Sequence, residues 1–346
     1  MTAEPDQSIE PDERLESELS EAAEAVSGAL ARRPVVLVSG PTASGKSGLA
    51  ADAAAAFGGV VINADSMQVY RELSIITARP GASELAKAPH RLYGVLSGAE
   101  RCSAARWREL ALAEIEAAFA AGKLPIVVGG TGLYLRTLEE GLAPVPEIPE
   151  QVRLDTRAHF DAIGPEAFYA ELAECDPNMA ARLNVGDTQR LLRASEVFAA
   201  TGQSLAGWQA EQADNTAVSD PQLSLLKLAV IPEREALYAR CDARFAAMVS
   251  EGAIQEVESL LALGFDPGLP VMKAIGVRAF SAHLKGETSL ETAVSKAQQE
   301  TRRYAKRQMT WLRHQYAAEN VFKTQYSESL RPKIFNIIRQ YLLTLP

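Results

Sequence analysis

The chain has 346 residues, 47% hydrophobic and 23% charged, which suits one large or two modest domains with a sizeable core. No apolar run approaches the ~20 residues of a membrane span, and Met1–Arg33 lacks the basic start and apolar stretch of a secretory signal. The three cysteines lie far apart without Cys-x-x-Cys spacing, which argues against a disulfide framework or a zinc site. A reducing, cytoplasmic location is expected.

The N-terminal segment, residues 1–33, accounts for most of the net charge. The chain carries −9, and this segment holds nine acids against three bases, or −6, which leaves −3 for the remainder. A nearly neutral remainder is compatible with nucleic-acid binding through local basic patches. We expect residues 1–33 to form an acidic, disordered tail.

Short β-branched runs alternate with helical patterns along much of the chain. We predict buried parallel strands and intervening helices, with the strands at Pro34–Ser39, Gly58–Asn63, Leu124–Val128 and Leu223–Ile231 and the helices at Ser47–Phe57 and Ala104–Ala121. This alternation is typical of α/β folds in which helices cover a parallel sheet.

Residues 139–220 interrupt that alternation. They open with a Pro-rich linker at Gly141–Glu150 and continue as charged helical segments, and no strong strand follows until Leu223. We predict an all-helical insertion domain at 139–220, inside an α/β core formed by 34–138 and 221–316. Residues 317–346 are expected to form a peripheral C-terminal segment.

A phosphate-binding motif follows the first predicted strand. Eight residues match G-x-x-x-x-G-K-[ST], namely Gly40, Pro41, Thr42, Ala43, Ser44, Gly45, Lys46 and Ser47. The glycines let backbone N–H groups converge on a phosphate, and the following helix adds its partial positive charge. Lys46 supplies a full charge, and the Ser47 hydroxyl can hold Mg²⁺. The core is therefore predicted to be a P-loop NTPase-like parallel sheet flanked by helices, while kinases, NTPases and diphosphate-releasing transferases all remain open.

An acidic residue follows the second predicted strand. Asp65 lies at the carboxyl end of that strand, where ligands bind in sheets of this kind. It can ligate a metal or accept a proton from a nucleophile. Alternatively, Asp65 or Ser66 caps a short helix. The local sequence does not choose between these roles.

Six motifs, in order, resemble those of the tRNA dimethylallyltransferases, also called tRNA isopentenyltransferases. They are GPTASGKS (40–47), NADSMQVYR (63–71), GGTGLY (129–134), GDTQRLLRA (186–194), KAIG (273–276) and TRRYAKRQMTW (301–311). The resemblance covers roughly residues 34–313. It departs after Gly276, where the family usually has Tyr and this chain has Val277, followed by Arg278 and Ala279.

The resemblance implies transfer of a dimethylallyl group from dimethylallyl diphosphate to N6 of the adenosine 3′ of the anticodon in tRNA. Residues 42–47 would cradle the diphosphate together with Mg²⁺, and Lys46 would stabilise the leaving group. Asp65 would be the general base, and Thr42 would lie near the leaving oxygen. Arg240 would point towards the diphosphate; without the resemblance it is an ordinary surface charge.

The resemblance also implies a set of tRNA contacts. Asp65, Ser66, Met67 and Gln68 would meet the flipped adenosine, and Thr131 would line its channel. Residues of the insertion domain would contact the anticodon stem-loop, namely Arg153, Gln189, Arg190, Leu191, Leu192 and Arg193. Further contacts would come from Lys273, Arg278, Arg303, Lys306, Arg307 and Arg313. The run 301–316 has no acid and suits a helix that offers cations to phosphates, although a basic surface helix balanced by neighbouring acids is the alternative.

Other classes of function share some of these features. A transferase acting on free AMP, ADP or ATP would have the P-loop and Asp65, but it would not need the insertion or the basic helix. A small-molecule P-loop kinase would bind ATP, and a non-catalytic RNA-binding module would not need an intact Lys46, Ser47 and Asp65. We expect a monomeric enzyme.

Overall fold

The computed structural model describes residues 26, 29–214 and 223–345, so most of the predicted tail lies outside the described residues. The chain divides into two compact units, one of residues up to 138 with those from 222 onward, and one of residues 139–221. The second unit occupies the region for which the sequence predicts a helical insertion. Among the described helices, none is long and apolar enough to cross a membrane.

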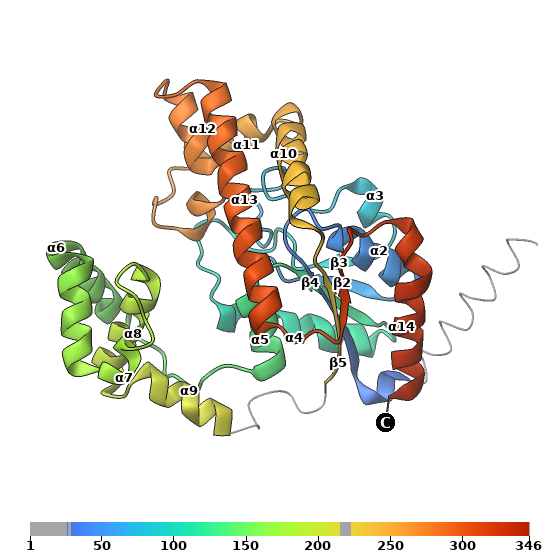
Figure 1. Ribbon diagram of the computed structural model, residues 1–346, viewed down its shortest axis with the longest axis horizontal. Helices are drawn as coiled ribbons and strands as arrows, with labels where there is room; N and C mark the ends of the chain where they lie inside the picture. Colours follow the sequence, from blue (N-terminus) through green and yellow to red (C-terminus); the bar gives the residue numbers. More distant parts are fainter. Residues whose placement is uncertain (1–25, 27–28, 215–222, 346) are drawn as a thin grey trace, which may run out of the picture. The chain divides into compact units, whose positions relative to one another are not determined.

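The first unit contains a six-stranded parallel sheet in the order β3-β2-β4-β1-β5-β6 (Figure 1). The strands are β1 (Pro34–Ser39), β2 (Val60–Asn63), β3 (His90–Arg91), β4 (Pro125–Gly129), β5 (Ser224–Val230) and β6 (Asn320–Phe322). Four of them coincide with predicted strands, which confirms the α/β fold class. The edge strands β3 and β6 were not predicted, because two or three residues are too few to give a periodic pattern.

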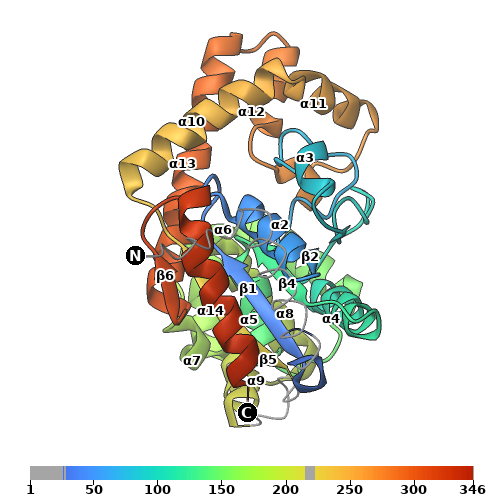
Figure 2. The ribbon, with the colours of Figure 1, turned by 90° about the vertical axis from the view of Figure 1, so that its right-hand side faces the viewer.

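Alternate side chains of β1 enter two different cores. Val35 and Leu37 belong to one apolar cluster, and Val36 and Val38 belong to the other. Strand side chains alternate between the faces of a sheet, so a strand buried on both faces reads as a continuous apolar run. The Val36–Val38 face is covered by α2 (Lys46–Ala56) and α14 (Arg331–Thr344), which lie over β1 in Figure 2.

Further helices of the first unit contribute residues to the other apolar cluster. They are α4 (Ala104–Ala120), α5 (Gly132–Glu140), α10 (Arg234–Ser250), α11 (Ala253–Ala262), α12 (Val277–Leu284) and α13 (Leu290–Gln315), with the short α3 (Ala82–Leu85), η1 (Leu30–Arg32), η3 (Pro270–Lys273) and η4 (Glu328–Leu330) between elements. The N-cap residue of α13 is Ser289, whose hydroxyl accepts the Thr292 N–H at 3.2 Å. This side-chain cap satisfies one backbone donor of the first turn. α10 and α12 pack against α13.

The C-terminal segment is less peripheral than the sequence suggests. β6 pairs with β5, and α14 buries Ile334, Ile338 and Leu342 in the core beneath the sheet. Their spacing of four residues places them on one helix face. The expectation of a peripheral segment was therefore wrong for residues 320–345, because the apolar stripe of α14 completes one face of the sheet.

The regular secondary structure described in the second unit is all helical. Its helices are α6 (Glu150–Cys175), α7 (Pro177–Ala180), α8 (Thr188–Thr201) and α9 (Leu205–Asp214). α6 is interrupted at Gly164, whose φ of 80° departs from the helical region just before Pro165. A separate apolar cluster holds the unit together, with Phe168, Leu172 and Leu191 among its members. The unit thus has its own small core.

Candidate active site

The loop of residues 40–47 joins β1 to α2 and has the strained backbone of a phosphate-binding turn. Ala43 and Gly45 have φ of 65° and 90°, in the region that favours glycine. A Cβ on Gly40 would lie 2.6 Å from Ser44 Oγ and 2.8 Å from the Val230 carbonyl oxygen, so only glycine fits there. The Ser44 hydroxyl is buried without a hydrogen-bond partner among the described residues. A buried polar group without a partner is costly, and an anion in the loop would satisfy it.

Lys46 is the charged residue of this loop. Its Nζ donates to the Pro41 carbonyl oxygen at 3.3 Å. Burial lowers the pKa of Lys46 to about 8, and the nearby Asp65 carboxylate opposes that shift. An anionic ligand would favour the charged ammonium in the same way. The loop therefore has a cation placed to bind a phosphate group.

Arg244 is a residue of this site that the sequence did not single out. From α10, its guanidinium donates to the Thr42 hydroxyl. Burial lowers the pKa of Arg244, while the nearby Cys241 and Asp65 raise it, so the cation lies inside the site rather than in solvent. The predicted Arg240 is exposed one turn earlier on the same helix. Each arginine precedes one residue of the buried Leu237–Cys241–Phe245 stripe, so helical spacing alone could not distinguish them.

Asp65 lies just after β2 and is positioned by its neighbours. Its N–H donates to Oδ1 of buried Asn63 at 2.9 Å, and Asn63 Nδ2 donates to the Asp65 and Leu92 carbonyl oxygens at 3.1 and 3.0 Å. One carboxylate oxygen of Asp65 accepts the Met67 N–H at 2.9 Å, which is the local capping role. Its second oxygen has no hydrogen bond within the described residues. Asp65 can therefore cap the turn and still accept a proton.

Thr131 connects the loop after β4 with the loop after β2. Its Oγ1 accepts the Ser66 N–H at 3.0 Å and lies 3.4 Å from the Ser66 hydroxyl. The hydroxyl of Tyr304, from α13, also lies near Thr131. Burial and then the charge of Asp65 raise the pKa of Tyr304, so its hydroxyl stays protonated. The predicted neighbours Ser66, Thr131 and Asp65 therefore come together in the structure.

Gln68 has a structural partner that the sequence did not reveal. Its Nε2 donates to the Thr77 and Ala78 carbonyl oxygens at 2.8 and 3.0 Å. The same loop is held from α11 by Glu256, whose carboxylate accepts the N–H groups of residues 74, 75 and 76 at 2.7 to 2.9 Å. Gln68 and Glu256 thus hold the backbone of residues 74–78.

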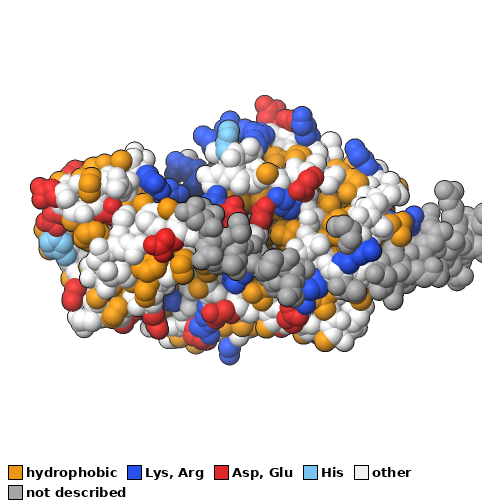
Figure 3. Space-filling view, turned by 90° about the horizontal axis from the view of Figure 1, so that it is seen from below, with side chains coloured by type: hydrophobic (Ala, Val, Ile, Leu, Met, Phe, Trp, Pro, Cys, Tyr) orange, Lys and Arg blue, Asp and Glu red, His pale blue; other side chains and the backbone are white. Residues whose placement is uncertain are grey.

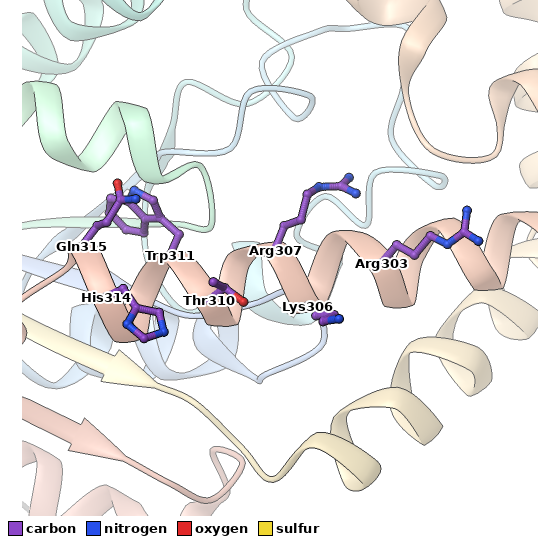
Figure 4. A pocket seen from close by; sticks show the side chains of 7 residues that line it. All are labelled: Arg303, Lys306, Arg307, Thr310, Trp311, His314 and Gln315. Carbon is purple, nitrogen blue, oxygen red and sulfur yellow. The ribbon is translucent and has the colours of Figure 1, made fainter. Parts of the chain in front are cut away.

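The C-terminal half of α13 presents an exposed row of polar side chains. An open hollow of ≈ 440 Å³ is lined by Arg303, Lys306, Arg307, Thr310, Trp311, His314 and Gln315 (Figure 4). The predicted Arg313 is exposed on the same helix, whereas Arg302 pairs with Asp242. The face drawn in Figure 3 has acids and bases interspersed, with Lys and Arg most densely gathered beside a histidine.

The remaining predicted tRNA contacts lie on both units. Lys273 and Arg278 are exposed on the first unit, and Val277 and Ala279 beside them are packed in its core. On the second unit, Gln189 and Arg190 are exposed, while Arg153 and Arg193 form ion pairs with Glu150 and Glu196 at 3.6 and 3.5 Å.

Two predicted tRNA contacts need correction. Leu191 and Leu192 are 0% and 8% exposed within the core of the second unit. They pack the helix that presents Gln189, Arg190 and Arg193, and their side chains do not reach its surface.

Comparison with known proteins agrees with these motifs. The model of the IPP transferase family matches residues 68–315, and that of the isopentenyl transferases matches residues 33–102. A tRNA dimethylallyltransferase of Paramagnetospirillum magneticum is 54% identical over 313 residues, covering 90% of this chain and 98% of the relative. One of Rhodospirillum centenum is 56% identical over 292 residues, covering 84% and 92%.

Solved structures show the same relationship. The full-length tRNA isopentenylpyrophosphate transferase of Bacillus halodurans is 31% identical with a TM-score of 0.65, covering 91% of this chain and 98% of that one. A eukaryotic dimethylallyltransferase acting on tRNA is 28% identical with a TM-score of 0.74, covering 88% and 78%. With a family match over most of its length and relatives more than half identical, this chain belongs to the IPP transferase family.

Proposed function

We infer that this protein is a tRNA dimethylallyltransferase, which moves a dimethylallyl group from dimethylallyl diphosphate to N6 of the adenosine 3′ of the anticodon. The observation that carries this proposal is that two cations and one carboxylate lie near one another at the carboxyl ends of the strands. These groups are Lys46, Arg244 and Asp65. The curated relatives named above are tRNA dimethylallyltransferases, and they support the same reading.

The cationic side of the site suits the leaving group. As the allylic C–O bond breaks, negative charge gathers on the diphosphate, and fixed cations stabilise such charge strongly where water is excluded. Lys46 and the backbone of residues 42–47 would bind the phosphates. The Arg244 guanidinium, already bonded to the Thr42 hydroxyl, would hold Thr42 towards the leaving oxygen.

Mg²⁺ would bind together with the diphosphate. No group of three or more His, Cys, Asp or Glu side chains within the described residues is arranged to hold a metal by itself. Mg²⁺ usually keeps several waters and takes few protein ligands when substrate phosphates are present. The Ser47 hydroxyl, next to Lys46 in the first turn of α2, fits that pattern. When bound, the ion would neutralise charge on the diphosphate.

Asp65 would act on the nucleophile. The N6–carbon bond forms as the carbon–oxygen bond breaks, and the amine loses a proton that the free oxygen of Asp65 accepts. An adenine amine is a weak nucleophile, so orientation matters as much as proton transfer. The hydrogen bond from the Asp65 N–H to Asn63 holds the Asp65 backbone, and the bond from the Met67 N–H orients its carboxylate for this purpose.

The exposed row on α13 would bind the RNA backbone. Arg303, Lys306 and Arg307 present three cations along the hollow, and the Arg136 guanidinium lies 5.9 Å from the centre of the Trp311 ring. Cations supply affinity for phosphates, and aromatic rings stack on exposed bases. We propose further contacts from the second unit through Gln189, Arg190 and Arg193, and from Arg153, Lys273, Arg278 and Arg313.

Two alternatives share the phosphate site. A transferase acting on free AMP, ADP or ATP, or a small-molecule kinase, would use Lys46 and the P-loop in the same way. Neither would need the row of exposed cations on α13, which favours a polyanionic acceptor. We propose a cytoplasmic location, where tRNA is modified and where the free thiols of Cys102, Cys175 and Cys241 would persist.

One experiment separates these functions. Radiolabelled dimethylallyl diphosphate and Mg²⁺ are incubated with either an unmodified anticodon stem-loop RNA or free AMP, using the full chain and Lys46→Ala. We expect the label to be transferred to the stem-loop. We expect this transfer to be lost with Lys46→Ala, and also with an RNA that carries guanosine at the target position. Label on AMP alone would establish the free-nucleotide transferase, and no label on either acceptor would contradict prenyl transfer.

A further inference from the structure

Gln308 is a buried polar side chain, 6% exposed, on the inner side of α13. Its amide group bridges two loops of the site. The Thr42 N–H donates to Gln308 Oε1 at 2.8 Å, and Gln308 Nε2 donates to the Gly130 carbonyl oxygen at 2.9 Å. Both ends of the amide are therefore used within the protein.

The two loops that Gln308 joins end adjacent strands. β1 and β4 pair in parallel, with Ser39 opposite Gly129, so Thr42 and Gly130 follow the same edge of the sheet. A Cβ on Gly130 would lie only 2.2 Å from Gln308 Nε2, which explains why glycine is needed at this position. The Gly130 backbone thus lies in close contact with the Gln308 side-chain amide. This amide acts as a spacer, because it sets the distance between the Thr42 N–H and the Gly130 carbonyl oxygen.

The same side of α13 reaches a third loop. The hydroxyl of Tyr304, one turn before Gln308, lies near Thr131 and Gln308, and Thr131 accepts the Ser66 N–H beside Asp65. The outer side of the helix presents Arg303, Lys306 and Arg307 (Figure 4). The Arg307 guanidinium lies 5.7 Å from the centre of the Tyr304 ring. One helix thus carries the cations on one side and the spacer on the other.

We propose that Gln308 is a positioning residue, which sets the P-loop Thr42 at the correct distance from the loop that supports the base side of the site. This inference rests on the proposed transfer reaction. Thr42 would then be fixed at two points, by Gln308 through its N–H and by Arg244 through its hydroxyl. Reacting groups that lie about 1 Å out of place lose much of the rate, so the spacer acts on turnover without touching either substrate.

Two variants test the two bonds. Gln308→Met keeps the length of the side chain and removes both bonds. Gln308→Glu keeps the acceptor for Thr42 but presents a donor to Gly130 only when the carboxyl group is protonated, and burial raises a carboxyl pKa. Gln298→Met is the matched control, because Gln298 lies earlier on the same helix and donates to a backbone oxygen, that of Asp242 at 3.1 Å, and not to either of the two loops that Gln308 joins.

The measurements are prenyl transfer to the stem-loop RNA from pH 6 to 9, RNA binding by fluorescence anisotropy, and Mg²⁺–diphosphate binding by calorimetry. Gln308→Met should lower kcat about 10- to 100-fold and weaken diphosphate binding, while RNA affinity stays within about twofold. Gln308→Glu should regain activity relative to the wild type as pH falls, which a purely structural role would not produce. Gln298→Met should behave like the wild type in all three assays.

Equal diphosphate affinity and kcat for Gln308→Met and the wild type would overturn the proposal. So would a parallel loss of RNA affinity and kcat, or a Gln308→Glu defect that does not change with pH. Absence of transfer by the wild type would count against the proposed reaction instead, and the diphosphate-binding comparison would still decide the role of Gln308.

Discussion

The hydroxyl of Tyr326 donates a 2.7 Å hydrogen bond to Oδ2 of Asp52, on the helix that follows the P-loop. Lys87 and Arg331 donate to the same carboxylate at 2.7 and 3.0 Å. The Tyr326 N–H also donates to the Ser44 carbonyl oxygen at 3.3 Å. The C-terminal segment therefore holds the phosphate-binding loop and its helix through both backbone and side chain.

We predict that Tyr326→Phe lowers the free energy of unfolding by about 1.5–3 kcal/mol at neutral pH, the range for hydrogen bonds to charged groups. Burial alone would raise the pKa of Asp52, but the bonds from Lys87 and Tyr326 lower it overall. Because the folded-state pKa is below the unfolded value, this stabilisation is present above the unfolded pKa and disappears as pH falls through the folded one.

Urea unfolding at several pH values checks this prediction. Tyr341→Phe is the control, because the Tyr341 hydroxyl donates to the Ser224 carbonyl oxygen, which does not titrate. A Tyr326→Phe penalty that is the same at all pH values would contradict the role of Asp52.

The pKa of Lys46 predicts an alkaline limit to activity. Burial lowers this pKa to about 8, so the free enzyme carries the ammonium below that pH and loses it above. We expect kcat/KM for dimethylallyl diphosphate to fall about tenfold per pH unit above the pKa, since kcat/KM reports on the free enzyme. Lys46→Arg should remove this alkaline limb, because arginine stays charged. A limb that persists in Lys46→Arg would assign the titration to another group.

Replacing the general base should slow turnover without releasing RNA. Asp65→Asn keeps an acceptor for the Met67 N–H but cannot take a proton, so kcat should drop about 10²- to 10⁴-fold. Stem-loop affinity, measured by anisotropy, should change little. Weaker RNA binding with normal turnover at saturation would refute the assignment of Asp65 as base.

Substitutions of Arg244 and Arg240 should differ in their effect on KM for dimethylallyl diphosphate. Arg244→Lys loses the planar guanidinium that donates to Thr42, and we expect KM for dimethylallyl diphosphate to rise about tenfold or more. Arg240→Lys, on the exposed side of the turn before, should change KM by less than about threefold. Steady-state kinetics of the two variants compares them directly, and a larger effect at Arg240 would restore the expectation drawn from the sequence.

Charge reversal on α13 should affect RNA and spare the small substrate. Arg303→Glu should raise KM for tRNA and reduce the slope of binding against salt by about one or more, with KM for dimethylallyl diphosphate unchanged. Lys285→Glu makes the same charge change at an exposed position away from the hollow. If both variants weaken RNA binding equally, the effect is one of net charge and the hollow is not the binding surface.

The sequence predicted most of the sheet and the loops at its edge. β1 and β4 have long apolar runs, and the P-loop has fixed spacing, so both can be recognised without tertiary information. Asp65 could be placed because parallel strands bring their carboxyl ends to one edge. β3, β6 and the apolar stripe of α14 were missed or undervalued because they are short or depend on a partner that the local pattern does not reveal.

The side chains that support the site were harder to predict. Arg244 and Arg240 have equivalent positions on the helical wheel, and only their distance from Thr42 along α10 separates them. Gln308 lies in a motif that looks basic and RNA-directed, yet its amide turns inward to Thr42 and Gly130. Leu191 and Leu192 lie in a polar motif but pack a core. In each case the role of the side chain depends on the direction in which it points from its helix. Tertiary packing sets that direction, and the local sequence does not reveal it.

The packing of α14 has a practical consequence for where the chain can be cut. The family match ends at residue 315, but Ile334, Ile338 and Leu342 are almost fully buried beyond it, each worth about 1.5–3 kcal/mol when removed from water. A protein truncated at that boundary would leave the part of one sheet face that α14 covers exposed to solvent, with β5 as an open edge. Exposed apolar faces and unpaired edges promote aggregation. The folding unit therefore extends past the region by which the family is recognised.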